Sequence, residues 1–172
     1  MKKELGFAML EVLISFLIIM IGVLGLAGLQ MMAINNTEVA RYQSLAVLLA
    51  SNMATQMQSN AAYWGTAPTN ITVTNTSITG GPAAGPNCGS TLCTGPEMAN
   101  YDLQNWGASV ASTLPSGNGQ ITCVANTPAV CTLTLFWLEK NVALSNPTGA
   151  ETGQLASGQS ATHNYQTMVT IQ

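Results

Sequence analysis

The sequence predicts an α+β protein in which a long N-terminal helix packs against a small antiparallel β-sheet. Three observations support this prediction. The first proline is Pro68, so nothing interrupts a helix from about Phe7 to about Ala62. Residues 121–140 and 164–172 alternate apolar and polar side chains, as strands do. With 172 residues, the chain provides one domain and an added anchor.

The composition excludes one class of partner. Charged residues make up 6% of the chain, whereas about 25% is usual in soluble domains. The net charge is −3, and Lys and Arg together number only four. Nucleic-acid-binding proteins need a basic patch, so we expect no nucleic acid as partner. The abundance of Thr, Ser, Asn, Gly and Gln suits short strands and long polar loops.

The N-terminal segment is apolar from Leu5 to Leu29, with the acid Glu11 near its start. No charged residue occurs from Val12 to Thr37, and a helix needs about 20 apolar residues to span a bilayer. Lys2 and Lys3 would keep the N-terminus cytoplasmic, so the C-terminal part would lie across the membrane.

Three interpretations of this segment compete. The apolar run is too long for a secretory signal peptide, and no clear small-x-small cleavage site ends it. A plain membrane anchor leaves Glu11 unexplained, because a carboxylate at membrane depth costs a few kcal/mol or more. Cleavage between Gly6 and Phe7 would create an amine four residues before Glu11. The amine of a neighbouring copy, shifted by about one helical turn, could then pair with Glu11 and select one axial register.

The stretch KKELGFAMLEVL resembles the class III leader and first turns of type IV pilins and pseudopilins. Their pattern is a short basic leader, a glycine, an aromatic residue or Met, and a glutamate at the fifth mature position. Gly6, Phe7 and Glu11 match it. The resemblance implies the pilin fold, with a prepilin peptidase that cleaves after Gly6 and methylates the Phe7 amine. It also implies that Glu11 sets the register of docked subunits.

The resemblance and the hydropathy pattern together predict four segments. Residues 1–6 form the leader, residues 7–37 the transmembrane and filament-core half of the helix, and residues 38–64 its amphipathic half. Residues 65–172 form a periplasmic globular domain, which we call the head. The amphipathic half has apolar residues at steps of three and four: Tyr42, Leu45, Ala46, Leu49, Met53 and Met57.

Gly22, Gly25 and Gly28 recur every three residues in the apolar half. This spacing fits close helix–helix approach in a filament core, or a place where the helix can stretch or melt. Glycine is also simply common in membrane helices. Major pilins typically have a helix-breaking proline in this region, and its absence here indicates a subunit unlike the main one.

In the head, we expect residues 65–100 to form a loop with one short strand at Ile71–Thr74. A helix is predicted at 97–114, a hairpin at 121–140 and a final strand at 164–172. Trp106 and Trp137 lie on apolar-periodic faces and are predicted core residues.

Three titratable residues of the head receive structural interpretations. Asp102 is expected at the start of a helix. Glu139, beside Lys140, is interpreted as a solvated strand end. His163, a lone loop histidine, has no carboxylate or serine pattern around it. We therefore expect no catalytic residue, and no enzyme.

The four cysteines, Cys88, Cys93, Cys123 and Cys131, all lie in the C-terminal half. An even count in a loop-rich exported domain predicts two disulfides, with three connectivities open. The close spacing favours Cys88–Cys93 and Cys123–Cys131. A zinc site would need histidine partners, and the one histidine is distant in sequence, so we expect no metal and no cofactor. Disulfides imply an oxidising compartment such as the bacterial periplasm.

The stretch YDLQNWGASVASTLPSGNGQITC, with CTLTLFWLE after it, resembles the PilV-type minor pilins, or type IV pilus modification proteins. The matching residues of the head are Asp102, Trp106, Leu114, Pro115, Gly117, Cys123, Trp137 and Glu139. This resemblance implies a structural subunit that takes part in pilus assembly and initiation and affects adhesion. Its partners would be prepilin peptidase, other minor and major pilins, and the inner-membrane assembly platform.

The same resemblance implies storage as a single-pass protein of the bacterial inner membrane, followed by incorporation into a surface pilus. A minor pseudopilin of a type II secretion system shares the leader and the long helix, and it stays an alternative. A membrane-tethered periplasmic enzyme would need a cluster of titratable residues, which the head nearly lacks. An adhesin whose long polar loops carry recognition is compatible with the pilin interpretation.

Overall fold

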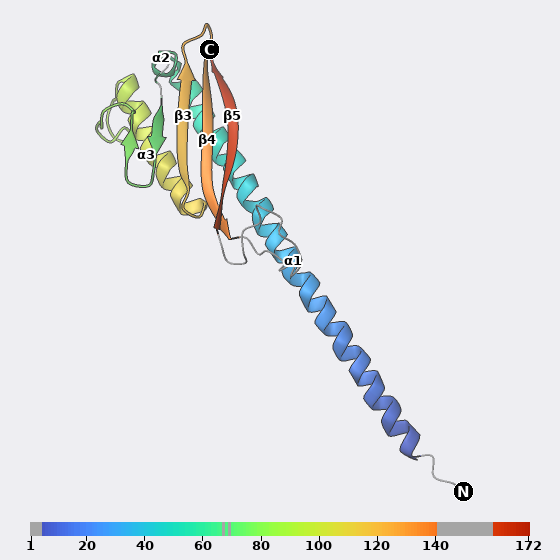
Figure 1. Cartoon of the computed structure of the whole chain (residues 1–172). Helices are drawn as coiled ribbons and strands as arrows, with labels where there is room; N and C mark the ends of the chain where they lie inside the picture. Colours follow the sequence, from blue (N-terminus) through green and yellow to red (C-terminus); the bar gives the residue numbers. More distant parts are fainter. Residues whose placement is uncertain (1–4, 67, 69, 141–159) are drawn as a thin grey trace. The chain divides into compact units, whose positions relative to one another are not determined.

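A computed structural model describes residues 5–66, 68, 70–140 and 160–172. The elements within these ranges are α1 (Leu5–Ser59), α2 (Ala61–Trp64), β1 (Ile71–Val73), β2 (Ile78–Thr79), α3 (Gly95–Thr113), β3 (Asn118–Val124), β4 (Ala129–Lys140) and β5 (Ser160–Ile171). The predicted α+β layout is confirmed, because an N-terminal apolar helix precedes a small antiparallel sheet (Figure 1). The chain divides into two units, Met1–Ala40 and Arg41–Gln172, and α1 contributes to both.

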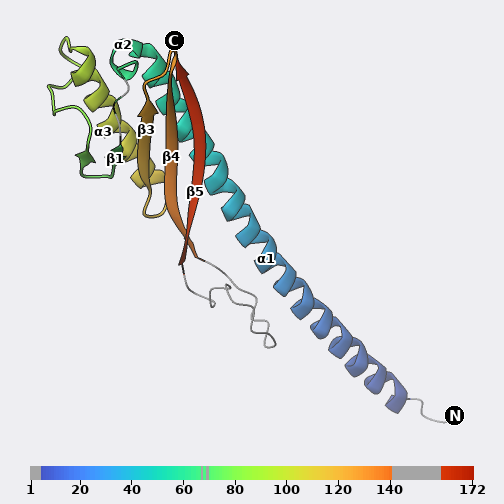
Figure 2. The same cartoon turned by 45° about the horizontal axis from the view of Figure 1, so that its top comes forward.

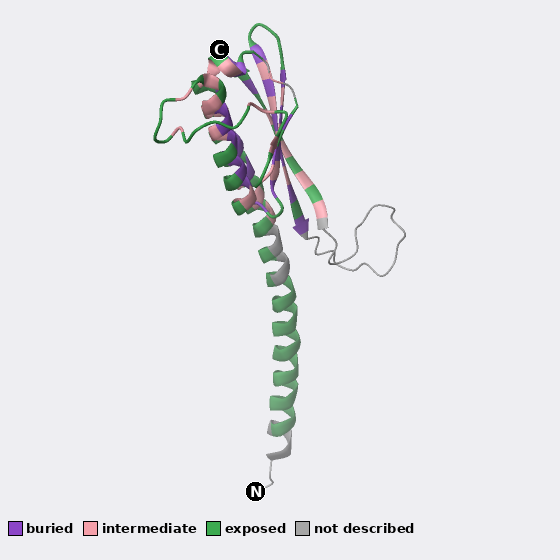
Figure 3. Cartoon of the chain, turned by 90° about the vertical axis from the view of Figure 1, so that its left-hand side faces the viewer, coloured by how far each residue is buried: buried purple, intermediate pink, exposed green. Residues whose placement is uncertain are grey.

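The first unit contains the apolar part of α1. Residues Met9–Gln30 form one helical segment that is long and apolar enough to cross a membrane. At 1.5 Å per residue, its 22 residues span about 33 Å, against about 30 Å for the hydrocarbon core of a bilayer. Every residue of this segment is exposed (Figure 3), so the described part of the chain does not cover it.

In the second unit, α1 becomes amphipathic. Its buried side chains recur at helical spacing and are Ala46, Leu49, Ala50, Met53 and Met57. The helix ends at Ser59, earlier than the predicted end near Ala62, and α2 follows after Asn60. The Asn60 side chain donates a hydrogen bond to the Gly95 carbonyl at 2.7 Å, which ties the end of α1 to the start of α3.

The sheet of the second unit has the strand order β2-β1-β3-β4-β5, and every neighbouring pair is antiparallel (Figure 2). Side chains alternate along β4, so one face of the strand is buried and the other is half-buried or exposed. The buried side chains of the sheet are Ile71, Val73, Ile121, Cys123, Ala129, Cys131, Leu133, Leu135, Trp137, Glu139, Val169 and Ile171. Strand β2 was not predicted, because two residues are too few to show a period.

The start of α3 is fixed by a capping box. The Glu97 carboxylate accepts hydrogen bonds from the backbone N–H and the hydroxyl of Thr94, both at 2.8 Å. These bonds lower the pKa of the Glu97 carboxyl below its usual value. The bond from the Thr94 backbone N–H is the larger cause, and the bond from the Thr94 hydroxyl is the second. The expected position of Asp102 at a helix start is wrong: it lies inside α3, where burial raises the pKa of its carboxyl.

Helix α3 is joined to α1 by its tryptophan. Trp106 is 3% exposed, and its indole N–H donates to the Leu49 carbonyl at 3.0 Å. Gly119 of β3 lies against the Trp106 ring, where a side-chain carbon would have no room. The close packing of β3 against the Trp106 ring of α3 therefore depends on glycine at this position. Ala99, Leu103 and Val110 of α3, with Leu114 directly after it, complete this side of the core.

Candidate functional site

The first candidate site is the Glu11 segment of α1. Residues 6 and 7 lie in the first turn of the helix, one turn before Glu11. Glu11 is exposed beside the apolar residues Val12 and Phe16, and the Ser15 hydroxyl donates to the backbone carbonyl of Glu11 at 2.8 Å. For the Glu11 carboxylate itself, the described part of the chain supplies neither a hydrogen-bond donor nor an ion-pair partner.

Among the described residues, the Glu11 carboxylate therefore has no compensating partner near the start of the apolar segment. If the Met9–Gln30 segment lies in a membrane, Glu11 enters the bilayer or its boundary with no partner from the described residues. The chemistry that satisfies such a group is a cation or several hydrogen-bond donors. Any such partner has to come from outside the described residues.

The three glycines of the apolar segment have open space around them in the described structure. A side-chain carbon placed at Gly22, Gly25 or Gly28 would meet nothing within 4 Å. The packing of the described chain therefore does not require glycine at these positions. A requirement for small residues here would come from another helix, since glycine lets two helix backbones approach closely.

In the second unit, the cysteines form two disulfides. Cys88 pairs with Cys93, with a Cα–Cα distance of 5.6 Å, and Cys123 pairs with Cys131. These are the two pairings that the close spacing favours. Cys123 and Cys131 lie directly opposite each other in β3 and β4, so their bridge joins the two strands beside the turn.

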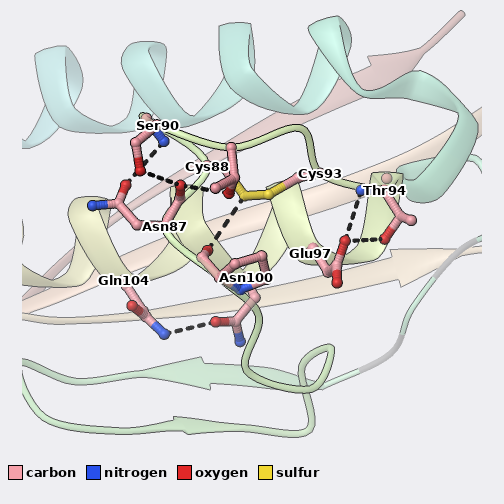
Figure 4. The surroundings of a disulfide bond; sticks show 12 residues. Asn87, Cys88, Ser90, Cys93, Thr94, Glu97, Asn100 and Gln104 are labelled. Carbon is pink, nitrogen blue, oxygen red and sulfur yellow. Dashed lines mark hydrogen bonds between the residues drawn. A yellow bond between two sulfur atoms is a disulfide. The ribbon is translucent and has the colours of Figure 1, made fainter.

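The Cys88–Cys93 bridge lies in the loop that leads into α3 (Figure 4). The Asn87 side chain accepts a hydrogen bond from the Gly89 N–H at 2.9 Å, and the Asn87 carbonyl accepts the Ser90 hydroxyl at 3.2 Å. The loop is thus closed by a covalent bond and a local hydrogen-bonded turn. Its end is continuous with the Thr94–Glu97 capping box that starts the helix.

Glu139 of β4 and His163 of β5 lie close together beside Trp137, whereas the sequence predicted a solvated acid and a lone loop histidine. Glu139 is 6% exposed and accepts the Trp137 indole N–H at 2.6 Å. Its other carboxylate oxygen lies 3.5 Å from Nε2 of His163, whose ring stacks on Trp137. The interpretations of Glu139 as a solvated end and of His163 as a lone loop residue are therefore wrong.

The register of the sheet explains these corrections. Glu139 follows Trp137 by two residues and so lies on the same buried face of β4. His163 is in β5 and pairs directly with Trp137. The Trp–x–Glu sequence on a strand is the signal that could have placed Trp137 and Glu139 on one face. The position of His163 depends on the pairing of β5 with β4, which the sequence does not show. Across the described ranges, no three His, Cys, Asp or Glu side chains gather as a metal site would need.

Comparisons with known proteins add no further assignment. No family model, no curated protein and no solved structure matches the chain. The functional assignment depends on the Glu11 segment, on the disulfide-stabilised head and on the leader-like sequence before Phe7.

Proposed function

We propose that this chain is a non-catalytic minor pilin that takes part in type IV pilus assembly and initiation. In this proposal the chain is made as a precursor, and prepilin peptidase cuts it between Gly6 and Phe7. The mature protein waits in the bacterial inner membrane with its head in the periplasm. It then joins a pilus with other minor and major pilins through the inner-membrane assembly platform.

The observation that carries this proposal is Glu11, an acid at the start of the apolar segment for which the described residues supply no partner. After cleavage, the Phe7 amine would be the nearest cation, four residues before the acid. An amine on the same helix is present in any arrangement of subunits, but it is an imperfect partner, because the helix holds it about one turn away from the carboxylate. The amine of a neighbouring subunit can neutralise the carboxylate at only one axial offset, about 6 Å along the helix, since four residues rise about 1.5 Å each.

Pairing between subunits would make one register of the packed helices better than the others. Burying a carboxylate without a partner costs several kcal/mol, so a wrong register is penalised strongly. The exposed apolar surface around Glu11 supplies the rest of the contact, because it must be covered by lipid or by other helices. The outward-facing Gly22, Gly25 and Gly28 are compatible with close approach of these helices.

The head fits the compartment that this proposal requires. All four cysteines are paired in disulfides, and such bonds persist in the periplasm and outside the cell. The charge-poor surface and the absence of a basic patch in the sequence fit contacts with other protein subunits better than contacts with nucleic acid.

The test compares Glu11→Ala and Glu11→Gln with Glu38→Ala in cells that assemble type IV pili. Glu38 is a matched control, because it is an exposed acid of the same helix that lies outside the apolar segment. We expect both Glu11 variants at normal levels in the membrane, but at about one tenth or less of the wild-type level in sheared filaments, since each 1.4 kcal/mol is a factor of ten.

Normal incorporation of Glu11→Ala into filaments would overturn the register argument. A chain that is processed at Phe7 but never reaches surface filaments, and that is needed for protein secretion, would instead support the minor pseudopilin alternative.

A further inference from the structure

A polar groove lies on the second unit. It is lined by residues 74–78 around the β1–β2 turn, by residues 81–84 after β2, and by Asn100 and Gln104 of α3. We call it the β2–α3 groove. Its volume of about 520 Å³ is within the range of small-molecule sites, about 300–1,000 Å³.

Hydrogen bonds hold both walls of this groove in place. Asn100 is 4% exposed, and its side-chain N–H donates to the Pro82 carbonyl at 2.8 Å. Gln104 donates in turn to the Asn100 side-chain oxygen at 2.7 Å (Figure 4). On the opposite wall, the Thr74 N–H donates to the Ser77 carbonyl at 2.9 Å, and the Ser77 N–H donates to the Thr74 hydroxyl at 3.1 Å. A ligand would therefore meet a site that is already formed.

The polar side chains that line the groove are all uncharged. The lining contains amides, hydroxyls and apolar groups, and no Asp, Glu, Lys, Arg or His. Among the described residues, the side chains of Asn75 and Thr76 and the side-chain oxygen of Gln104 have no hydrogen-bond partner within the chain. These groups offer both donors and acceptors to a ligand.

This chemistry selects among ligand classes. An anionic or cationic ligand would be partly desolvated without a counter-charge, which is unfavourable. A purely apolar ligand would leave the amides of the groove without partners. A hydroxyl group both donates and accepts, so adjacent hydroxyls match the side-chain amides of Asn75 and Gln104.

We propose that the β2–α3 groove binds a neutral saccharide. The lining has no aromatic side chain on which a sugar ring could stack, so we expect weak binding, with a dissociation constant of about 1 mM. This proposal does not depend on the assembly role of Glu11, and it holds for a free sugar and for a sugar unit of a larger glycan.

The test is ligand-observed saturation-transfer NMR on the full chain in a zwitterionic detergent without a sugar headgroup. The probes are glucose, galactose, mannose and N-acetylglucosamine, with the acidic sugar N-acetylneuraminic acid for comparison. We expect saturation transfer to at least one neutral sugar, and a dissociation constant for the acidic sugar that is at least about fivefold weaker.

Two variants locate the site. Gln104→Leu and Asn75→Ala should each weaken binding about fivefold or more, because each removes one hydrogen-bonding side chain. Asn105→Leu is the matched control, since Asn105 is an exposed amide on the same helix but does not line the groove. The control should bind as the wild type does.

Three results would overturn the proposal. One is the absence of transfer to every neutral sugar at about 20 mM, where a 1 mM site would be nearly saturated. Another is binding that Gln104→Leu and Asn75→Ala leave unchanged. The third is a groove that binds an uncharged peptide rich in Ser, Thr and Asn more tightly than any of the neutral sugars, in a way that depends on Gln104.

Discussion

The packing of β3 against α3 makes a prediction about Gly119. A side-chain carbon at this position would overlap the six-membered ring of Trp106. The strand cannot retreat easily, because Gly119 pairs with Val73 on one side and with Leu135 on the other. In Gly119→Ala, the Trp106 ring must therefore turn and give up its hydrogen bond to the Leu49 carbonyl.

The expected cost follows from these two effects. Overpacking a well-packed core costs about 1–3 kcal/mol, and the loss of one buried hydrogen bond costs about 1 kcal/mol. Gly119→Ala should therefore lower the free energy of unfolding by about 2–4 kcal/mol. The assay is urea unfolding of the full chain in detergent micelles, followed by near-ultraviolet circular dichroism. Gly28→Ala is a matched control, because a side-chain carbon there meets nothing within 4 Å, and it should leave this transition unchanged.

A double-mutant cycle sharpens this test. Trp106→Phe removes the ring atoms that the new methyl group would meet. In that background, Gly119→Ala should cost at least about 1 kcal/mol less than in the wild type. Two results would refute the reasoning: a Gly119→Ala protein within about 0.5 kcal/mol of the wild type, or strictly additive effects in the double mutant.

Three other predictions concern the same unit. Glu139→Ala should lower the free energy of unfolding by about 1–3 kcal/mol, because it leaves the buried Trp137 indole N–H without an acceptor. Glu139→Gln keeps an acceptor and should cost less, so equal losses of the two variants in urea unfolding would contradict this prediction. Because the pKa of Glu97 is lowered from 4.5 on folding, its contribution to stability is present above that value and is lost as the pH falls through the folded pKa. Glu97→Gln should remove this part of the acid dependence, and an unchanged pH–stability curve would argue against the capping box. Replacing Cys88 and Cys93 by serine should cost about 2 kcal/mol, as measured by urea unfolding, since the bridge closes a short loop; no loss would mean that the bridge contributes nothing.

Local patterns predicted most of the fold. The helix expected at 97–114 is α3, Gly95–Thr113, because its apolar residues recur at steps of three and four. The hairpin at 121–140 corresponds to β3 and β4, because alternation and a central turn are both visible in the sequence. The N-cap could also have been found, since Thr94 and Glu97 form a Thr–x–x–Glu box.

Features that depend on long-range pairing could not be predicted. His163 lies beside Glu139 only because β5 pairs with β4 in one register. The bond from Trp106 to Leu49 joins residues that are 57 positions apart. The β2–α3 groove likewise depends on how Asn100 meets the segment after β2, and no periodic pattern describes that contact.

The central claim is that Phe7 becomes the N-terminus and supplies the amine that Glu11 needs. The most direct test is intact mass and N-terminal sequencing of the protein extracted from membranes of pilus-forming cells. The account predicts a chain that begins at methylated Phe7 in the wild type, and in Glu11→Ala as well. A chain that still begins at Met1 in cells with active prepilin peptidase would contradict the account, and Glu11 would again be a charge without a partner.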